Sequence, residues 1–570
     1  MYSPLPLTSE ELTRLNWSDI EPWYRELQGI TLSQETLSAW LLQWSRLSEL
    51  IDEVLVTHEI ACSRNTADKE REQRQQRFLD EVYTHVQSQD QVLKEHLLIS
   101  GLCPEGFAIP LRNLRTEAAL FREANVPLLN EEKRLIAEYF QAGGSQMVTW
   151  EGKEIGINAL WPVLAEPDRA RREHAWRAIH ERLLADRTVR HEQWTKLLQL
   201  RQQIAYNAGY DDYREYRWLQ LLRFDYTPAE SKAFHTLVEQ EVVPVARLLW
   251  EKRRQMLGVE KLRPWDQKVN PWARTAPRPI TDVSKVIQQC ATLFQKIDPS
   301  FGTYFKTMMQ EDLLDLEVRP HKVQAGFNGY LQARRRSFIF GHVNSIQDII
   351  PLVLHESGHA FHGFETFALP YIQQKQEGMI PTEFAEVAST SMELIGSMYL
   401  HASGICTEAE EVQIRIYHLE NLLLDFIPSI ARGDAFQHWL YEHPELAMDQ
   451  KQLEQKWAEL TLRYLPDLDW SGLESELGVR WQRILHFYYV PFYLLEYVFA
   501  ALGALQIWSN YLRDPQRALQ QYRHALSLGA TRTVPELYAA AGATFSFDAS
   551  TLRPLLNLVL QTIKELQTQL

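Results

Sequence analysis

Cysteine is scarce in this chain, and the cysteines that are present do not pair in sequence. Cys62, Cys103, Cys290 and Cys406 are spread over 570 residues without a CxxC motif. This pattern excludes a disulfide framework and favours a reducing compartment. The N-terminal stretch, MYSPLPLTSEEL, also lacks the basic and then apolar pattern of a signal peptide. We therefore expect a cytoplasmic protein.

Long apolar runs and an excess of basic charge are absent as well. The most apolar stretch, residues 487–508, is interrupted by Pro491 and Glu496, so we expect a buried helix there and no membrane span. The formal net charge of −15 argues against nucleic acid as a partner, because phosphate binding needs clustered Lys and Arg. No pattern in the sequence specifies an oligomeric state.

Helical periodicity fills most of the chain instead. Apolar residues recur three and four apart in residues 8–57, in 129–223 and from about residue 348 to the end. Residues 311–343 are the best β candidate, and 147–155 (MVTWEGKEI) are weakly strand-like. A chain of this length exceeds one simple core. We predict a mainly α fold in lobes, with a small sheet just before residue 348.

An HExxH motif follows the β candidate at His355, Glu356 and His359. Residues four apart on a helix share a face, so both imidazoles can bind one metal ion. Glu356 flanks that face and can take a proton from a metal-activated water. Chance supplies only about 0.05 such matches in a chain of this composition, so we favour a zinc site over two core histidines. Asp348 is expected to cap this helix.

A third metal ligand is expected on the next predicted helix. Glu386 and Glu393 are seven residues apart and share a face, and Glu383 lies one turn before Glu386. The residues alone leave Glu383 and Glu386 as alternatives. Three carboxylates on one helix face are usually solvated, but beside an HExxH helix they favour a ligand with a supporting group. His362, one turn after His359, is expected to support the site without binding the metal.

These segments resemble a known family. Residues 355–362 read HESGHAFH, similar to the HExGHxxH motif of the zinc oligopeptidases typified by thimet oligopeptidase and oligoendopeptidase F. Residues 384–390 read FAEVAST and resemble the family segment that supplies the glutamate ligand. The resemblance implies that Glu386 is the third ligand of one Zn²⁺ per chain. It also implies that Glu393 supports the site from behind.

The same resemblance implies an architecture. We expect a two-lobed helical zincin with a small β-sheet beside the HExxH helix and a deep substrate channel. The expected division is an N-terminal helical region, residues 1–200, and a catalytic domain, residues 201–570.

Two further segments resemble the substrate-binding parts of this family. Residues 315–327 (DLEVRPHKVQAGF) are similar to the oligoendopeptidase pattern of DL, R, K and GF. Residues 337–340 (SFIF) resemble the strand along which the peptide lies. The resemblance implies that a peptide pairs near the second of these segments as an added β-strand. The implied substrate contacts are Gly326, Phe327, Phe338 and Phe340.

Residues 486–497 (HFYYVPFYLLEY) resemble the family segment whose histidine and tyrosines stabilise the oxyanion. The chain departs from the family here, because Leu495 stands where relatives commonly have a tyrosine. The alternative for each tyrosine is packing in an aromatic core. The candidates for the oxyanion group are His486, Tyr489, Tyr493 and Tyr497.

The predicted function is internal hydrolysis of short peptides by a metal-activated water, with Glu356 as general base. One alternative is a zinc exopeptidase of the carboxypeptidase or dipeptidase type, since endopeptidases and exopeptidases can both use an HExxH motif with a distal glutamate. The other is a catalytically inactive, peptide-binding helical protein, against which the intact Glu356 argues.

Overall fold

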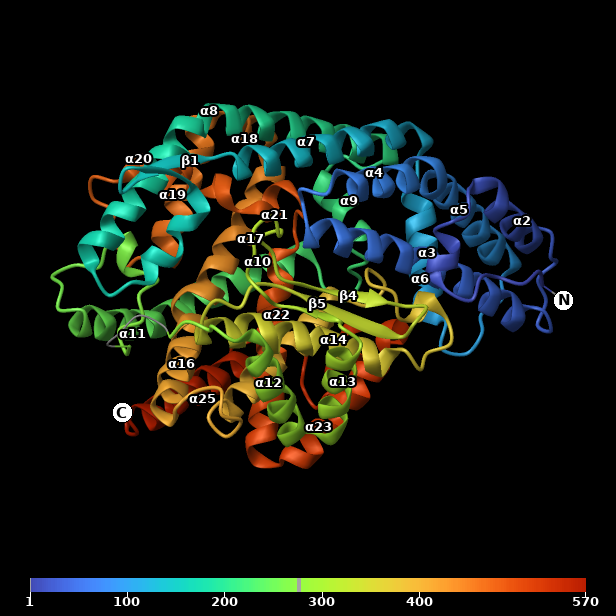
Figure 1. Ribbon diagram of the computed structural model, residues 1–570. Helices are drawn as coiled ribbons and strands as arrows, with labels where there is room; N and C mark the ends of the chain where they lie inside the picture. Colours follow the sequence, from blue (N-terminus) through green and yellow to red (C-terminus); the bar gives the residue numbers. More distant parts are fainter. Residues whose placement is uncertain (1, 274–277) are drawn as a thin grey trace. The chain divides into compact units, whose positions relative to one another are not determined.

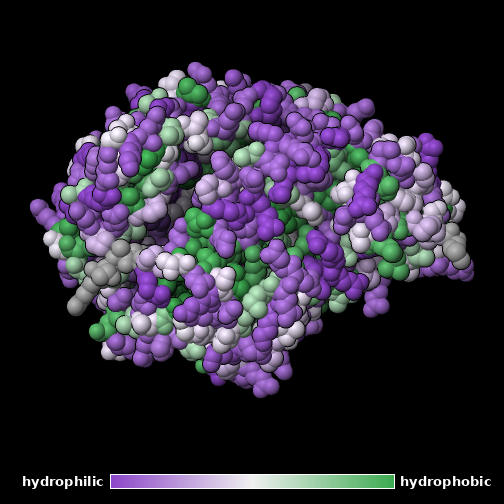
Figure 2. Space-filling model, viewed as in Figure 1, coloured by the Kyte–Doolittle hydropathy of each residue, from purple (hydrophilic) through white to green (hydrophobic). Residues whose placement is uncertain are grey.

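The computed structural model describes residues 2–273 and 278–570 (Figure 1). This part of the chain is mainly helical, as predicted, and its strands are short. None of its helices combines the length and apolar character that crossing a membrane requires. The face shown in Figure 2 is largely hydrophilic.

Contacts between residues divide the chain into two compact units, each assembled from three stretches. The first unit comprises Met1–Ala119, Arg278–Glu411 and Ala500–Phe545, and the second comprises Leu120–Pro277, Val412–Phe499 and Ser546–Leu570. The boundary expected at residue 200 stays a prediction.

The first unit contains a small sheet surrounded by helices. Its strands are β3 (Leu314–Asp315), β4 (Phe327–Leu331) and β5 (Arg336–Phe340). Its helices include α1 (Ser9–Leu12), α2 (Trp17–Gln28), α3 (Leu37–Arg64), α4 (Lys69–Phe78), α5 (Thr84–Ser100), α6 (Ala108–Leu120), α12 (Val283–Ile297), α13 (Pro299–Gln310), α14 (His355–Thr366), α15 (Thr382–Gly396), α23 (Pro515–Ser527) and α24 (Val534–Ala540). Helix α22 (Leu494–Arg513) begins in the second unit and continues into the first.

The sheet lies within the predicted β segment and has the strand order β3-β5-β4. Strand β5 pairs in parallel with β3 and antiparallel with β4, which makes β4 an edge strand. Residues 337–340 of β5 are all buried, which is why this strand reads as an almost continuous apolar run. Helix α14 packs against β4 and β5, and Figure 1 shows it directly below them.

The described residues of the second unit are helical apart from one hairpin. The weakly strand-like segment forms β1 (Met147–Trp150) and β2 (Lys153–Gly156), joined at Glu151 and Gly152, which both have positive φ as a tight hairpin turn requires. The helices include α7 (Val126–Gly144), α8 (Arg169–Ala208), α9 (Tyr213–Gln220), α10 (Pro228–Leu237), α11 (Val243–Met256), α16 (Glu408–Asn421), α17 (Ile427–Glu442), α18 (Pro444–Ala447), α19 (Gln450–Tyr464), α20 (Glu474–Val479), α21 (Leu485–Tyr488) and α25 (Ala549–Gln567).

The start of the motif helix differs from the prediction. Ser345, not Asp348, is the N-cap, and the two residues form a capping box. The Asp348 carboxylate accepts a hydrogen bond from the Ser345 N–H at 2.9 Å, which places Asp348 inside the first turn. A π-helical segment, η8 (Ile349–Leu354), then leads into α14. Such segments occur frequently at functional sites.

Candidate metal centre

Helices α14 and α15 approach each other closely because of a glycine in the motif. A Cβ atom built on Gly358 would lie 2.5 Å from both the Ala388 carbonyl oxygen and the Ser389 Cα. Only a residue without a side chain permits this contact between two helix backbones. The close packing brings the histidines of α14 within reach of the carboxylates of α15.

Three potential ligands converge between these helices. The Nε2 atoms of His355 and His359 each lie 3.6 Å from Oε2 of Glu386. This distance is too long for a hydrogen bond. Two atoms that share a tetrahedral zinc ion at bond lengths of about 2.0–2.2 Å stand about 3.3–3.6 Å apart, so the donor set and its spacing fit zinc.

A hydrogen bond orients the first histidine. Nδ1 of His355 donates to Oε1 of Glu393 at 2.6 Å, which turns Nε2 toward Glu386, where a metal ion would take the place of its proton. Burial opposes protonation of His355, but the bond to Glu393 and the nearby carboxylates raise its pKa to about 10. Burial and the charge of His355 lower the pKa of His359 to about 3. The carboxylates around His355 thus favour a positive charge at that position, which a metal ion can supply in place of the proton. His359 stays neutral, as a metal ligand must be.

Glu356 is almost fully buried next to this group. Burial raises its pKa to about 7, against the opposing charge of His355. A carboxyl group with this pKa can accept and return a proton near neutral pH. Gly326 lies beside it, because a Cβ there would be 3.6 Å from Oε1 of Glu356 and 2.5 Å from Leu352. A side chain at position 326 would collide with Leu352, so the close approach of this backbone to Glu356 requires glycine.

Three residues that the sequence analysis did not single out support the centre. The Ser389 hydroxyl donates to Oε2 of Glu386 at 3.0 Å. The Tyr330 and Tyr522 hydroxyls donate to the His359 and Ala388 carbonyl oxygens at 3.0 and 2.7 Å. Ser389 stands one turn after Glu386, so helical spacing could have identified it, whereas β4 and α23 bring the tyrosines from distant parts of the sequence.

Two polar residues near the centre lie outside the ligand group. Glu383 is buried at the start of α15, but the converging carboxylate is that of Glu386. His362 is also buried and packs against the Phe384 ring at 6.0 Å. Neither ring nitrogen of His362 has a hydrogen-bond partner in the described part of the chain. A supporting role for His362 stays a prediction.

The segment before β4 is held by a cluster of ion pairs. Asp315 is bonded by Arg319 at 2.5 Å, by Lys322 at 2.9 Å and by Arg64 of α3 at 2.9 Å. Burial would raise the pKa of Asp315, but the hydrogen bonds from Arg319 and Lys322 hold it well below its usual range. The D, R and K positions of residues 315–327 therefore serve to hold the loop that leads to Gly326.

The predicted substrate contacts fall on two different strands. Phe327 begins the edge strand β4, whereas Phe338 and Phe340 are buried in the central strand β5. This corrects the expectation that a peptide pairs near Phe338 and Phe340, because β5 already has a neighbouring strand on each side. An added strand can join this sheet only at an edge, and β4 is one of its two edge strands.

In the second unit, three of the four oxyanion candidates form one aromatic cluster. The His486 ring centre lies 6.1 Å from that of Tyr493 and 5.8 Å from that of Tyr497. Tyr489 is exposed and contacts Phe140 instead. Leu495 is fully buried, so the position where relatives commonly have a tyrosine points into the core of this chain.

Arginines from outside the segment hold its backbone. Carbonyl oxygens within residues 487–492 accept hydrogen bonds from Arg201, Arg217 and Arg223. Arg223 also pairs with Glu496 at 2.5 Å, and both side chains are buried. The charge that interrupts the apolar run is thus paired within the core. No local pattern identifies these arginines, because their partners lie hundreds of residues away.

The second unit holds another group of potential ligands: His235, Asp434 and His438. Here Nε2 of His235 lies 2.7 Å from Oδ2 of Asp434, which is a hydrogen-bond distance. The Arg214 guanidinium is 3.4 Å from Nδ1 of His438 and opposes a cation. This group fits a buried hydrogen-bonded network between α10 and α17 better than a metal site.

Comparison with known proteins assigns the chain to a family. The model of peptidase family M3 matches residues 163–555, well over half of the chain. The chain belongs to peptidase family M3. Membership in M3 confirms the predicted family and its enzyme class, the metallopeptidases.

Relatives of this M3 chain include oligopeptidase PepF of Bacillus subtilis (strain 168), which is 28% identical over 210 residues. That match covers 35% of the chain and 29% of PepF, less than a third of the relative's length. The structure of PZ peptidase A with inhibitor 2 aligns with 99% of this chain and with 98% of its own chain. The TM-score is 0.85 and the sequence identity is 23%. The structure of oligoendopeptidase-F from Enterococcus faecium aligns with 97% of this chain and with 98% of its own chain. The TM-score is 0.61 and the sequence identity is 16%. These structures confirm the predicted helical M3 fold.

Proposed function

We propose that this chain is a zinc-dependent endopeptidase that cuts short peptides internally and carries one Zn²⁺. The observation that carries the proposal is the position of Glu386 Oε2, 3.6 Å from the Nε2 atoms of both motif histidines. His355, His359 and Glu386 would hold the ion. Zinc, when bound, lowers the pKa of a water molecule towards neutrality and polarises a carbonyl group.

The chain's own residues supply the proton transfers. Glu356 accepts a proton from the attacking water and later donates it to the amine that leaves. Its pKa of about 7 suits both directions of transfer. Glu393 keeps His355 oriented through the 2.6 Å bond to Nδ1. These roles need no residue outside α14 and α15.

The peptide would lie along β4 as an added strand. Main-chain hydrogen bonds to an edge strand bind peptides of many sequences, which suits a peptidase for varied short substrates. Gly326, directly before β4, is next to Glu356, and a peptide that follows β4 from there passes the base. Phe327, the first residue of β4, is the proposed contact for a substrate side chain.

The oxyanion role rests on the family resemblance of residues 486–497. His486 and one tyrosine would donate hydrogen bonds to the oxygen that becomes negative as water attacks. Tyr493 and Tyr497 are favoured over Tyr489, because both share a cluster with His486. A histidine and a phenol are both hydrogen-bond donors of the kind that stabilise a developing oxyanion.

Mass spectrometry of the products from a random peptide pool, with and without a chelator, tests this function. We expect internal cuts that disappear with the chelator, and one zinc per chain by elemental analysis. Glu356→Gln should keep the zinc and abolish turnover, so hydrolysis by this variant would refute the role of Glu356. Failure to cut peptides with blocked ends would indicate an exopeptidase. Bound zinc without any turnover would indicate a peptide-binding protein.

A further inference from the structure

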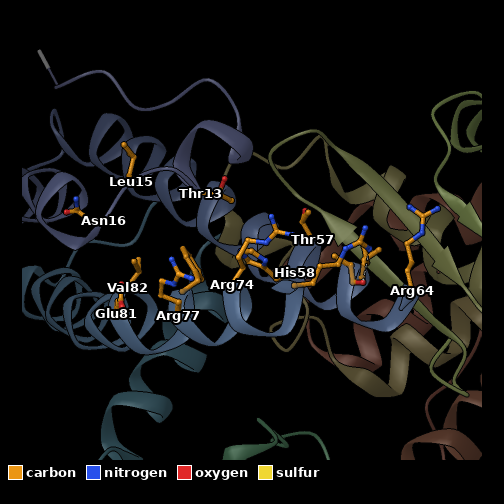
Figure 3. A pocket seen from close by; sticks show the side chains of 14 residues that line it. Thr13, Leu15, Asn16, Thr57, His58, Arg64, Arg74, Arg77, Glu81 and Val82 are labelled. Carbon is orange, nitrogen blue, oxygen red and sulfur yellow. Dashed lines mark hydrogen bonds between the residues drawn. The ribbon is translucent and has the colours of Figure 1, made fainter. Parts of the chain in front are cut away.

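We propose that a cavity in the first unit binds a small organic anion: a compact oxyanion, phosphate or carboxylate, attached to an apolar body. The cavity has a volume of about 620 Å³. It is lined by the loop after α1, by α3, by α4 and by the π-helical segment η1 (Leu79–Tyr83) (Figure 3). Small-molecule sites in proteins usually have volumes of roughly 300–1,000 Å³.

The lining is strongly basic in a chain whose net charge is −15. Arg71, Arg74 and Arg77 stand three residues apart on α4, and Arg64 comes from α3. Figure 3 shows Arg74 and Arg77 on α4, next to α3. Among the described residues that line the cavity, Glu81 alone is acidic. A local excess of positive charge in an acidic protein favours an anionic ligand.

Two of these guanidinium groups are only weakly engaged within the protein. Arg77 has no hydrogen bond or ion pair to any described residue, and it lines the cavity. Arg74 has one exposed ion pair, to Glu70 at 3.5 Å, which contributes little. Arg71, in contrast, is bonded to Asp68 at 2.9 Å and to the carbonyl oxygen of Ala61. Arg74 and Arg77 are therefore the groups available to an incoming anion.

Apolar side chains form another part of the lining. Ile60 and Phe78 are buried, and the His58 ring lies 5.7 Å from the Phe78 ring. Leu15 and Val82 also line the cavity. An ion alone would leave this apolar surface in contact with water, whereas an anion with an apolar body would cover it.

Guanidinium geometry narrows the chemistry further. Each planar fork can donate two parallel hydrogen bonds to one phosphate or carboxylate group. A phosphate monoester carries up to two negative charges at neutral pH, which matches the pair of available arginines more closely than a single carboxylate does. We therefore expect phosphate to bind more tightly than carboxylate.

Isothermal titration calorimetry with simple probes tests the site. Phenyl phosphate, which combines the anion with an aromatic body, should bind saturably to the full-length protein. Inorganic phosphate should bind more weakly and phenol should give no saturable heat, because each lacks half of the ligand. Comparison with benzoate distinguishes a phosphate ligand from a carboxylate ligand. Absence of saturable binding for both phenyl phosphate and benzoate would overturn the proposal.

Variants connect the binding to the cavity. The double variant Arg74→Gln, Arg77→Gln should weaken phenyl phosphate binding by at least about tenfold, because it removes two charged donors. Glu81→Gln should strengthen binding by removing the opposing charge. Arg25→Gln, on α2 and outside the cavity, removes one charge as a control and should change nothing. Wild-type affinity in the double variant would overturn the assignment. The measurement needs neither zinc nor turnover, so its result is independent of the proposed peptidase activity.

Discussion

Replacement of Gly358 by alanine tests whether the contact between α14 and α15 creates the metal centre. The new Cβ would lie 2.5 Å from the Ala388 carbonyl oxygen and from the Ser389 Cα, and 2.9 Å from the Ala388 carbonyl carbon. Since all three are backbone atoms, no side-chain rotation relieves the overlap. Ordinary contact between such atoms begins near 3.5 Å, so the two helices must separate by roughly 1 Å.

That separation acts on both stability and function. Overpacking of this kind costs about 1–3 kcal/mol of unfolding free energy. It also moves Glu386 away from the two histidines, while metal–ligand distances tolerate only about 0.2 Å. A misplacement of about 1 Å at a reacting centre can cost roughly a hundredfold in rate. We therefore expect weaker zinc binding and about a hundredfold slower peptide turnover.

The assays are urea unfolding, zinc competition against a fluorescent chelator, and turnover of a quenched fluorescent peptide. Gly144→Ala is the control, because Gly144 ends α7 and nothing lies within 4 Å of a Cβ built there. It should leave zinc binding and turnover unchanged and should not lower stability, because alanine suits a helix at least as well as glycine does. The reasoning is refuted if Gly358→Ala binds zinc and turns over peptide as the wild type does.

Further substitutions probe other parts of the chain. Glu393→Gln should weaken zinc binding about 10–100-fold in the chelator competition assay, because the residue orients a ligand; unchanged affinity would contradict this role. Asp315→Asn should cost about 3–5 kcal/mol in urea unfolding, because it leaves Lys322 buried without its carboxylate. Since its ion pairs lower the pKa of Asp315, its contribution is complete above about pH 3.9 and is lost as the pH falls below that value. Wild type and variant should therefore converge in stability in acid. Either Tyr493→Phe or Tyr497→Phe should lower kcat by about 10²–10³ with zinc retained, and normal kcat in both would exclude them as oxyanion donors.

Local spacing predicts the features that depend on one helix alone. His355 and His359 share a face because they are four residues apart, and Glu386 and Glu393 because they are seven apart. The β segment could be located, because the buried strand β5 reads as an apolar run. Ser345 with Asp348 is also a local pattern, because Ser345 is the N-cap and Asp348, where the cap was expected, completes the capping box.

The order of the strands could not be read in this way. Residues 327–331 and 336–340 both read as apolar strands, and nothing local distinguishes the central strand from the edge strand. The pairing of β5 with β3 depends on residues 314–315, and the peptide-pairing expectation therefore fell on the wrong strand. The arginines that hold residues 487–492 were invisible for the same reason, since their partners are remote in sequence.

The sequence by itself determined the candidate metal ligands, on an HExxH helix and a downstream acidic helix, and the family to which the chain belongs. Only the tertiary structure decided how Glu386, already implied by the family resemblance, meets both histidines, which strand is central, and which tyrosines share a cluster with His486. The physical reason is that helical periodicity is a property of neighbouring residues. Convergence of side chains depends on backbone packing, such as that at Gly358, between segments that are far apart in the chain.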